Sequence, residues 1–185
     1  MSSHPSLKDS VIEVAKLMMI SARTAPKSRG IDDIEITLLE DCGDLERLAD
    51  KMEEIGRETG RGFFIRDAEN IRRSSAVLLI GVRGDSAKEL DCGGCGYDGC
   101  EEFKKAEKRI RRDYSGPNCA LQLIDLGIAV GSAVKTASIL NVDNRVMFSA
   151  GVAAIKLGMI KCSVALGIPL SAHGKNIYFD RRWPR

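Results

Sequence analysis

The sequence predicts an α+β protein, a single domain of 185 residues that carries a cysteine-rich insertion. Three observations lead to this prediction. The segments 34–39 and 76–82 have the apolar, β-branched character of strands, and helical patterns separate them. A long and almost uncharged segment, 121–140, is expected to be a buried helix. Between these parts lies a glycine-rich block with three cysteines, which is too short for a core element.

The composition is that of an ordinary globular chain. Apolar residues make up 44% and charged residues 29% of the sequence, and the formal net charge is +2. So small an excess of positive charge gives no electrostatic reason to expect nucleic acid as a partner. Aromatic residues, at 5% of the sequence, are too few for base-stacking platforms. Charges interrupt every apolar run, so no membrane span is expected. Clustered cysteines without a secretory signal indicate a cytoplasmic location and a metal-binding role.

The N-terminal half is expected to alternate helices with two strands. The predicted elements are, in chain order, a helix over 6–21, a loop over 21–30, a strand over 34–39, a helix from Asp44 to Ile55, a helical turn over 67–71 and a strand over 76–82. Ser6 and Asp44 are residue types that cap helix N-termini. The loop is polar, basic and broken by proline and glycine, so it suits either a phosphate or plain solvent. The second strand is continuously apolar, as in a strand buried on both faces.

The C-terminal half is expected to be mainly helical. Its predicted elements are a helix over 101–110, a helix over 121–140, a helix over 145–157, a strand over 161–166 and a turn over 167–169. The first helix is predicted from a stripe of Phe103, Ala106 and Ile110. The second contains Gly127 and Gly131, each of which costs about 1 kcal/mol relative to alanine inside a helix. We therefore expect another helix, from the core or from a second subunit, to approach closely there.

The cysteine block, residues 91–100, is the part of the sequence that points to chemistry. Cys92, Cys95 and Cys100 are spaced C-x2-C-x4-C, with four glycines and no β-branched residue between them. Thiolates are ligands of zinc and of iron–sulfur clusters. Closing several of them around one centre bends the backbone sharply, and glycine permits such bends because it tolerates positive φ. The block is therefore interpreted as a cofactor-binding loop.

A fourth thiol is available downstream at Cys119. A helix from Glu101 to Ile110 would carry the chain about 15 Å away from the loop, at roughly 1.5 Å per residue. The nine residues that lead back to Cys119 can span about 30 Å when extended. The geometry therefore permits all four cysteines to surround one centre.

Two kinds of centre are compatible with four thiols. A structural zinc site usually pairs one Cys-x-x-Cys knuckle with a second. Three clustered ligands with one distant ligand are the common iron–sulfur arrangement, so a [4Fe–4S] cluster is favoured and zinc is the alternative. Ordinary reduced thiols are the third interpretation, which suits the isolated Cys42 and Cys162 better than the cysteine block.

The run from Cys92 to Phe103, followed by Gly-Pro-Asn-Cys119, resembles the four-cysteine [4Fe–4S] domain of corrinoid/iron–sulfur proteins. The resemblance implies that Cys92, Cys95, Cys100 and Cys119 are the cluster ligands. It also implies a cluster-binding insertion over 88–119 within one domain that spans 1–185. The whole chain in addition resembles a prokaryotic family of uncharacterised, ferredoxin-domain-containing proteins, which supplies no known activity.

A second resemblance involves the order of the elements, the stretch Ala-x-x-Ala-Pro-x-Ser over 22–28 and the stretch Ala-Leu-Gly-Ile-Pro over 165–169. Together these are similar to the FMN-dependent nitroreductase fold. The resemblance implies a three-layer sandwich around a mostly antiparallel sheet, and a homodimer with FMN at the subunit interface. The implied flavin-binding residues are Arg23, Lys27, Ser28, Lys175 and Asn176. The family's N-terminal Arg-Arg-Ser-x-Arg motif is absent from this sequence.

Three classes of function are compatible with these patterns. The first is a redox protein that transfers electrons through a [4Fe–4S] cluster, with a flavin in the body as a further carrier, and this class includes flavin- and iron–sulfur-dependent oxidoreductases. The second is a binding or sensor module that zinc or a cluster merely stabilises. The third is a docking partner in a corrinoid or other complex. The sequence contains no dinucleotide fingerprint, P-loop or nucleophile elbow, so those activities are not expected.

Overall fold

The computed structural model describes residues 6–179. Its centre is a four-stranded sheet in the order β1-β2-β6-β5, and each neighbouring pair is antiparallel. The strands are β1 (Ile34–Leu39), β2 (Ala76–Val82), β5 (Asp143–Asn144) and β6 (Val164–Ser171). This arrangement confirms the predicted α+β class with a central antiparallel sheet.

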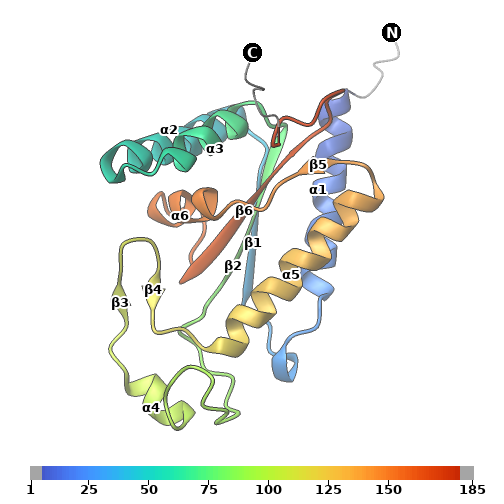
Figure 1. The fold of residues 1–185 in the computed structure, drawn as a ribbon. Coiled ribbons are helices and arrows are strands. Elements are labelled where there is room, and N and C mark those ends of the chain that lie inside the picture. The colour runs from blue at the N-terminus through green and yellow to red at the C-terminus, as the bar shows by residue number, and fades with distance from the viewer. Residues whose placement is uncertain (1–5, 180–185) are drawn as a thin grey trace.

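Helices cover both faces of the sheet, which gives the molecule three layers (Figure 1). One face carries α2 (Cys42–Thr59), α3 (Gly62–Arg72) and α6 (Phe148–Lys156), and the other carries α1 (Leu7–Thr24) and α5 (Ala120–Ile139). Each face has its own hydrophobic core. Val77 and Leu79 of β2 belong to the core on the α2, α3 and α6 side, whereas Leu78 and Ile80 belong to the core on the α1 and α5 side. The continuous apolar run of β2 is therefore explained, because all of its residues are buried.

Helix α6 packs unusually close to strand β6, since glycines remove the side chains between them. A Cβ atom placed on Gly151 would lie 1.9 Å from the carbonyl oxygen of Ala165, and one on Gly167 would lie 2.5 Å from Cβ of Ala150. Of the two alternatives predicted for Gly127 and Gly131 of α5, the structure excludes a helix from the core of the same chain. Nothing in the described chain lies within 4 Å of a Cβ placed on either one, so no helix of the same chain packs against them.

The cysteine-rich insertion joins β2 to α5 and forms the lower end of the molecule (Figure 1). After the cysteine loop come a short helix, α4 (Cys100–Lys105), and a hairpin of β3 (Arg109–Ile110) and β4 (Ser115–Gly116). The predicted helix over 101–110 is therefore wrong beyond Lys105. Ala106 leaves the helical region at ψ 134, and Ile110 is 90% exposed on the hairpin instead of lying on a buried stripe.

Two helix predictions need correction at their ends. Helix α2 begins earlier than predicted: Asp41 is its N-cap and accepts a hydrogen bond from the backbone N–H of Gly43, whereas Asp44 lies in the first turn. The predicted helical turn over 67–71 is part of the longer helix α3. The predicted helix over 145–157 is confirmed as α6, which is shorter than predicted at both ends.

The predicted turn over 167–169 is also wrong, because β6 runs straight through it. Gly167 exchanges backbone hydrogen bonds with Met147, on the side away from β2. Alternate residues of a strand present their backbone groups to the same side, so Pro169 also faces away from β2. Strand β5 pairs only with Leu170 and Ser171, so the N–H group that Pro169 lacks is not needed there.

Helix α5 is long and apolar enough by composition to cross a membrane, and it alone meets that criterion among the described residues. Core helices meet the same criterion, so the composition of α5 alone does not indicate a membrane span. Here α5 packs along α1 and the sheet, and its polar residues Gln122 and Asp125 are buried against the neighbouring strand and loops.

Candidate functional site: a four-cysteine module anchored by buried charges

The loop that carries the first three cysteines turns sharply at its glycines. The backbone N–H of Gly96 donates to the carbonyl oxygen of Gly93 over 2.9 Å, which closes a turn around Cys95. Both glycines have positive φ, +66° at Gly93 and +86° at Gly96. Side chains other than glycine rarely adopt such values, so the glycine content of the loop is required by its shape.

Asp91 fastens the two ends of this loop together. Its carboxylate accepts a hydrogen bond of 2.7 Å from the backbone N–H of Cys100, the first residue of α4. The thiols differ in exposure. Cys100 is buried, Cys95 is half-buried and Cys92 is exposed, so the loop presents part of its sulfur set to solvent.

Cys119 stands at the far end of the insertion, where α5 begins. It is the N-cap residue of α5, it is buried, and its backbone N–H donates to the carbonyl oxygen of Gly84 over 2.7 Å. A Cβ atom placed on Gly94 would lie 3.4 Å from Cβ of Ala120 and 3.6 Å from Sγ of Cys92. The loop around Cys92 therefore packs directly on the residue that follows Cys119.

The donor set consists of free thiols, which the structure does not group around one ion. All six cysteines are free thiols. Within residues 6–179, no three histidine, cysteine, aspartate or glutamate side chains are grouped as ligands of one ion. Tetrahedral zinc, with bonds to sulfur of about 2.3 Å, requires sulfurs about 4 Å apart. Thiolates are also the ligands of four-iron clusters, so the chemistry of the donor set is compatible with such a cluster.

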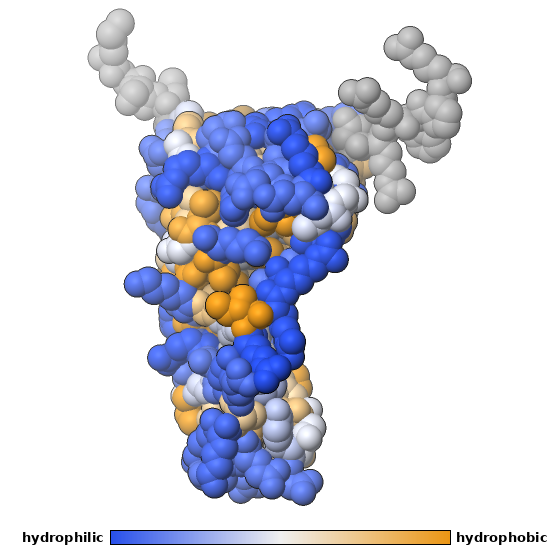
Figure 2. All heavy atoms as spheres, turned by 90° about the vertical axis from the view of Figure 1, so that its left-hand side faces the viewer, coloured by the Kyte–Doolittle hydropathy of each residue, from blue (hydrophilic) through white to orange (hydrophobic). Residues whose placement is uncertain are grey.

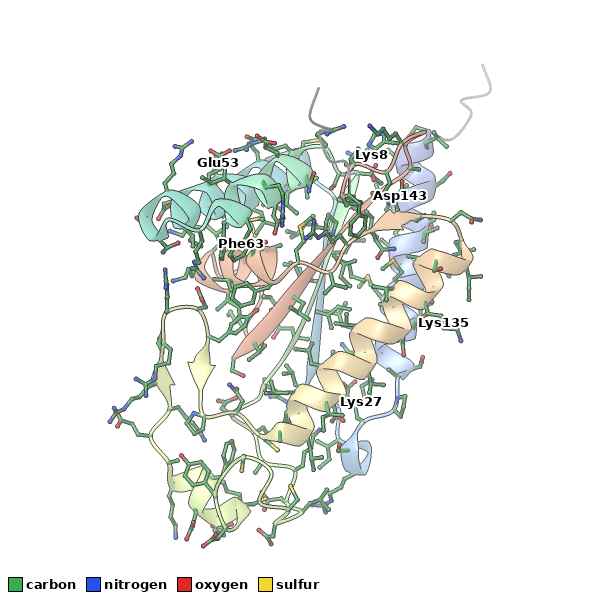
Figure 3. All side chains as sticks on the ribbon, in the orientation of Figure 1. Lys8, Lys27, Glu53, Phe63, Lys135 and Asp143 are labelled. Carbon is green, nitrogen blue, oxygen red and sulfur yellow. The ribbon has the colours of Figure 1, made fainter. Side chains whose placement is uncertain are left out.

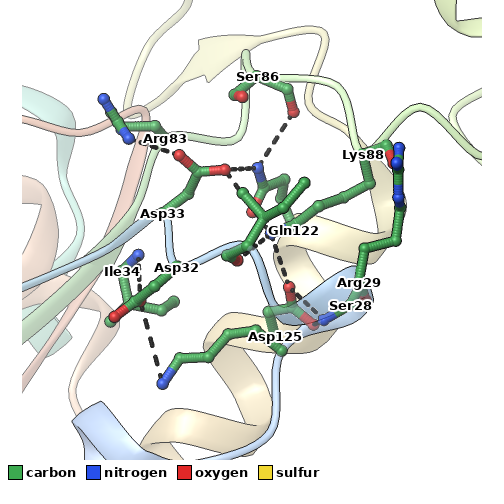
Figure 4. Close-up of polar contacts among 12 residues, drawn as sticks. Ser28, Arg29, Asp32, Asp33, Ile34, Arg83, Ser86, Lys88, Gln122 and Asp125 are labelled. Atoms are coloured by element: carbon green, nitrogen blue, oxygen red, sulfur yellow. Dashed lines mark hydrogen bonds and ion pairs between the residues drawn. The ribbon is translucent and has the colours of Figure 1, made fainter.

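A buried network of charges lies beside the module (Figure 4). The Lys88 side chain is 1% exposed, and its Nζ lies 3.1 Å from Oδ2 of Asp125 and 3.6 Å from Oδ2 of Asp33. It also donates to the carbonyl oxygen of Ile31 over 2.6 Å. Both carboxylates are almost fully buried as well. The network therefore pairs a buried cation with two buried anions and leaves the cation no contact with solvent.

Further hydrogen bonds complete the network around Asp33. Gln122 of α5 donates from Nε2 to Oδ2 of Asp33 over 2.6 Å and to the carbonyl oxygen of Ser86 over 3.2 Å. Arg83 donates to the other carboxylate oxygen. Burial by itself would raise the pKa of Asp33, but the hydrogen bonds from Gln122 and Arg83, with the charge of Lys88, hold that pKa below its usual value. Asp33 is therefore an anion at neutral pH.

This network fixes both ends of the module to the sheet. Lys88 stands four residues before Cys92, and Asp125 lies six residues after Cys119. Asp33 immediately precedes β1. Sequence reasoning missed these residues, because a charge in a sequence does not reveal its partner. The one available signal was Asp125, the only acid in an almost uncharged helix, since a buried acid needs a buried cation.

The basic loop predicted to hold a flavin phosphate is occupied by the protein's own groups. The backbone N–H of Ser28 donates to both carboxylate oxygens of Asp125, over 3.0 and 3.1 Å, and its Oγ donates over 2.9 Å. Arg23 pairs with Asp32 and donates to the carbonyl oxygen of Ile34. Lys27 is buried and donates to carbonyl oxygens of helix α1, and burial lowers its pKa.

The other two residues predicted for FMN, Lys175 and Asn176, follow β6 at the opposite end of the sheet. Nδ2 of Asn176 donates to Asp143 over 2.9 Å. Figure 3 shows Lys27 at the lower end of the molecule and Asp143 at the upper end. Strand β1 pairs over its whole length with β2, so the two ends are roughly 20 Å apart at 3.3 Å per residue. Within one chain, the five residues therefore lie in two groups, one at each end of the sheet.

Comparison with solved structures confirms the fold. The chain is similar to a BluB-like flavoprotein from Clostridium difficile 630, with a TM-score of 0.57 and 15% identity over 100% of this chain and 88% of that one. It is also similar to NfrA1 of B. megaterium, with a TM-score of 0.57 and 12% identity over 94% and 62%. An FMN-dependent nitroreductase from Clostridium difficile R20291 matches with a TM-score of 0.53 and 15% identity over 88% and 76%. The fold is therefore nitroreductase-like.

Sequence comparison shows the family. An uncharacterized protein of Archaeoglobus fulgidus is 51% identical over 175 residues, which cover 94% of each chain. Residues 115–181, which include Cys119, match the model described as "Uncharacterized protein containing a ferredoxin domain (DUF2148)". The family description and the nitroreductase-like fold together support a redox function in general terms. The chain belongs to this family of ferredoxin-domain-containing proteins.

Proposed function

We propose that this protein is a one-electron carrier that binds a [4Fe–4S] cluster through Cys92, Cys95, Cys100 and Cys119. When bound, such a cluster supplies reversible one-electron chemistry at a potential tuned by its surroundings. The observation that carries the proposal is the packing of the Cys92 loop against the start of α5, beside Cys119.

The surrounding residues have separable roles in this proposal. Asp91 keeps the loop closed, because its carboxylate holds the backbone of Cys100 close to the start of the loop that carries Cys92 and Cys95. Cys119 sits at the N-terminus of a twenty-residue helix, where the positive end of the helix dipole stabilises thiolate charge. Cys92 is exposed, which leaves one side of the module within reach of a redox partner. No step in the proposal uses flavin, because within one chain the residues implied for FMN lie at the two ends of the sheet.

We also propose that two chains form a homodimer through α1 and α5. Large apolar side chains are exposed along both helices, although these helices already cover the sheet. They are Leu17, Ile20, Leu123, Ile124, Ile128 and Ile139. The open space above Gly127 and Gly131 would admit a helix from a second copy. An exposed apolar face of this kind is typical of a protein interface.

The test of the cluster is metal analysis of protein purified without oxygen. We expect about four irons and four sulfides per chain, with a broad visible absorption band, and loss of both elements in Cys95→Ser. Cys42→Ser is the matched control, because Cys42 is an exposed cysteine far from the module, and it should keep the full iron content. One zinc per chain in colourless protein would support the structural-module alternative. Unchanged iron in Cys95→Ser would remove Cys95 from the ligand set.

A further inference from the structure

The insertion contains a strong local excess of positive charge. Residues 104–112 include six cations and one acid, Glu107. The cations are Lys104, Lys105, Lys108, Arg109, Arg111 and Arg112. The net charge of the segment is therefore +5, while the whole chain has a net charge of +2, so the remaining residues sum to −3. This charge asymmetry concentrates the positive potential of the molecule on one short segment.

This segment, which we call the basic arm, lies between two of the proposed cluster ligands. It begins inside α4, which starts at Cys100, and continues through β3, and the chain then returns through β4 to Cys119. Figure 2 faces this side of the molecule and shows an apolar area under α2 and α3, with mostly hydrophilic and some apolar side chains below it. A protein that docked on the basic arm would therefore lie next to the module.

Several cations of the basic arm are available to a partner. Lys104 pairs with Glu101 and Glu89, and Arg109 pairs with Glu107. Within residues 6–179, no ion pair involves Lys105, Arg111 or Arg112, and all three are exposed. Arg112 donates to the carbonyl oxygen of Thr59 over 3.4 Å, and Lys105 lies near enough to Glu101 to help Lys104 lower the pKa of that carboxyl. None of the three charges is held in an ion pair by the described chain, so they can attract an anionic surface.

The basic arm also has the shape of an interaction site. Ile110 is 90% exposed between Arg109 and Arg111. Beside it is a hollow of about 640 Å³ with a lining that includes Tyr97, Arg109, Arg111 and Pro117. Arginine and aromatic residues around an apolar contact are the residue types that dominate binding energy at protein interfaces. The arm is held in place by the body, because Asp113 forms a two-bond ion pair of 2.8 Å with Arg61.

We propose that the basic arm is the docking surface for a small acidic protein that carries single electrons. This inference rests on the proposed function and adds the class of partner. Opposite charge steers two proteins together and orients them, which can raise association rates by 10- to 1,000-fold at low salt, by order of magnitude. Orientation is needed here, because the exposed side of the module covers only part of the surface. Exposed Ile110 supplies the apolar contact that salt does not screen.

An acidic protein is favoured over a nucleic acid on two grounds. The cations occupy one short hairpin and helix end, and do not follow an extended groove as a nucleic-acid backbone requires. The hollow offers a single aromatic ring, Tyr97, and so provides no series of stacking platforms. Binding of nucleic acid is nevertheless an outcome that the experiment below distinguishes.

The experiment measures binding of a plant-type [2Fe–2S] ferredoxin, which is acidic, to the anaerobically purified protein at low and at physiological salt. We expect Lys105→Gln with Arg111→Gln to weaken binding about tenfold at low salt and to reduce its salt dependence. The matched control is Lys8→Gln with Lys16→Gln, which removes the same charge from α1 at the opposite end of the molecule and should leave binding within twofold (Figure 3). Basic cytochrome c should bind more weakly than ferredoxin.

Equal binding by the arm variant and the wild type would overturn the proposal. Tighter binding of a single-stranded oligonucleotide than of ferredoxin at physiological salt would also overturn it, in favour of a nucleic-acid partner. Circular dichroism and thermal unfolding of each variant check that the fold is kept. The binding measurement does not require electron transfer, so absence of a cluster would refute the proposed function and still leave the docking surface tested.

Discussion

At the scale of single residues, the most consequential side chain is one that the sequence does not mark as important. Lys88 is fully buried and ties Asp33 to Asp125, and so joins the start of β1 to α5 beside the proposed ligands. Breaking a buried ion pair by removing one partner costs about 3–5 kcal/mol, because the other charge is left without compensation. The position of the cysteines thus depends on residues that are not themselves ligands.

We predict that Asp33→Asn lowers the free energy of unfolding by about 3 kcal/mol at pH 7. The pKa of Asp33 is lower in the folded protein than in the unfolded chain, so its contribution is complete above the unfolded value, about 3.9, and is lost as the pH falls through the folded value. The difference between variant and wild type should therefore shrink below about pH 4 in urea titrations. Asp44→Asn, which breaks a surface pair with Arg47, should cost less than 1 kcal/mol. A difference that did not change with pH would exclude Asp33 ionisation as its cause.

At the scale of elements, the sequence predicted the strongly patterned parts and missed the ambiguous ones. The continuous apolar run of β2 and the uncharged length of α5 identified both elements, because burial on two sides requires such composition. The predicted strand ended before Gly167 and Pro169, whereas β6 continues through both. A sequence pattern cannot show that the backbone nitrogen of Pro169 faces a position where no neighbouring strand needs a hydrogen bond. The hairpin was missed because two paired residues on each strand are too few for any periodicity.

The exposed faces of α1 and α5 carry the second element-scale prediction, on oligomeric state. We expect a dimer in analytical ultracentrifugation, and Ile124→Asp should weaken its association at least tenfold, because it places a charge in an apolar interface. Ile110→Asp is the matched control, because Ile110 is also exposed but lies on the basic arm. A wild-type protein that stayed monomeric at about 100 µM would contradict the proposed interface.

At the scale of the whole molecule, a nitroreductase-like body supports a cysteine-rich insertion at one end of its sheet. The sequence predicted both parts, and it assigned flavin-binding residues by resemblance. The structure separates those residues between the two ends of the sheet, which a linear comparison cannot reveal. Ser28, in the loop expected to bind phosphate, instead donates to the carboxylate of Asp125. In this account the redox chemistry lies in the insertion, and the body positions it.

The most direct test of four thiolates around one cluster is low-temperature EPR spectroscopy of the anaerobic protein after reduction with dithionite. The account predicts a spin one-half signal of a reduced [4Fe–4S] centre in the wild type, present at about one spin per chain. In Cys119→Ser, the signal should disappear or change to that of a three-iron centre, while Cys162→Ser keeps the wild-type signal. A wild-type spectrum without any iron–sulfur signal, or an unaltered spectrum in Cys119→Ser, would contradict the account.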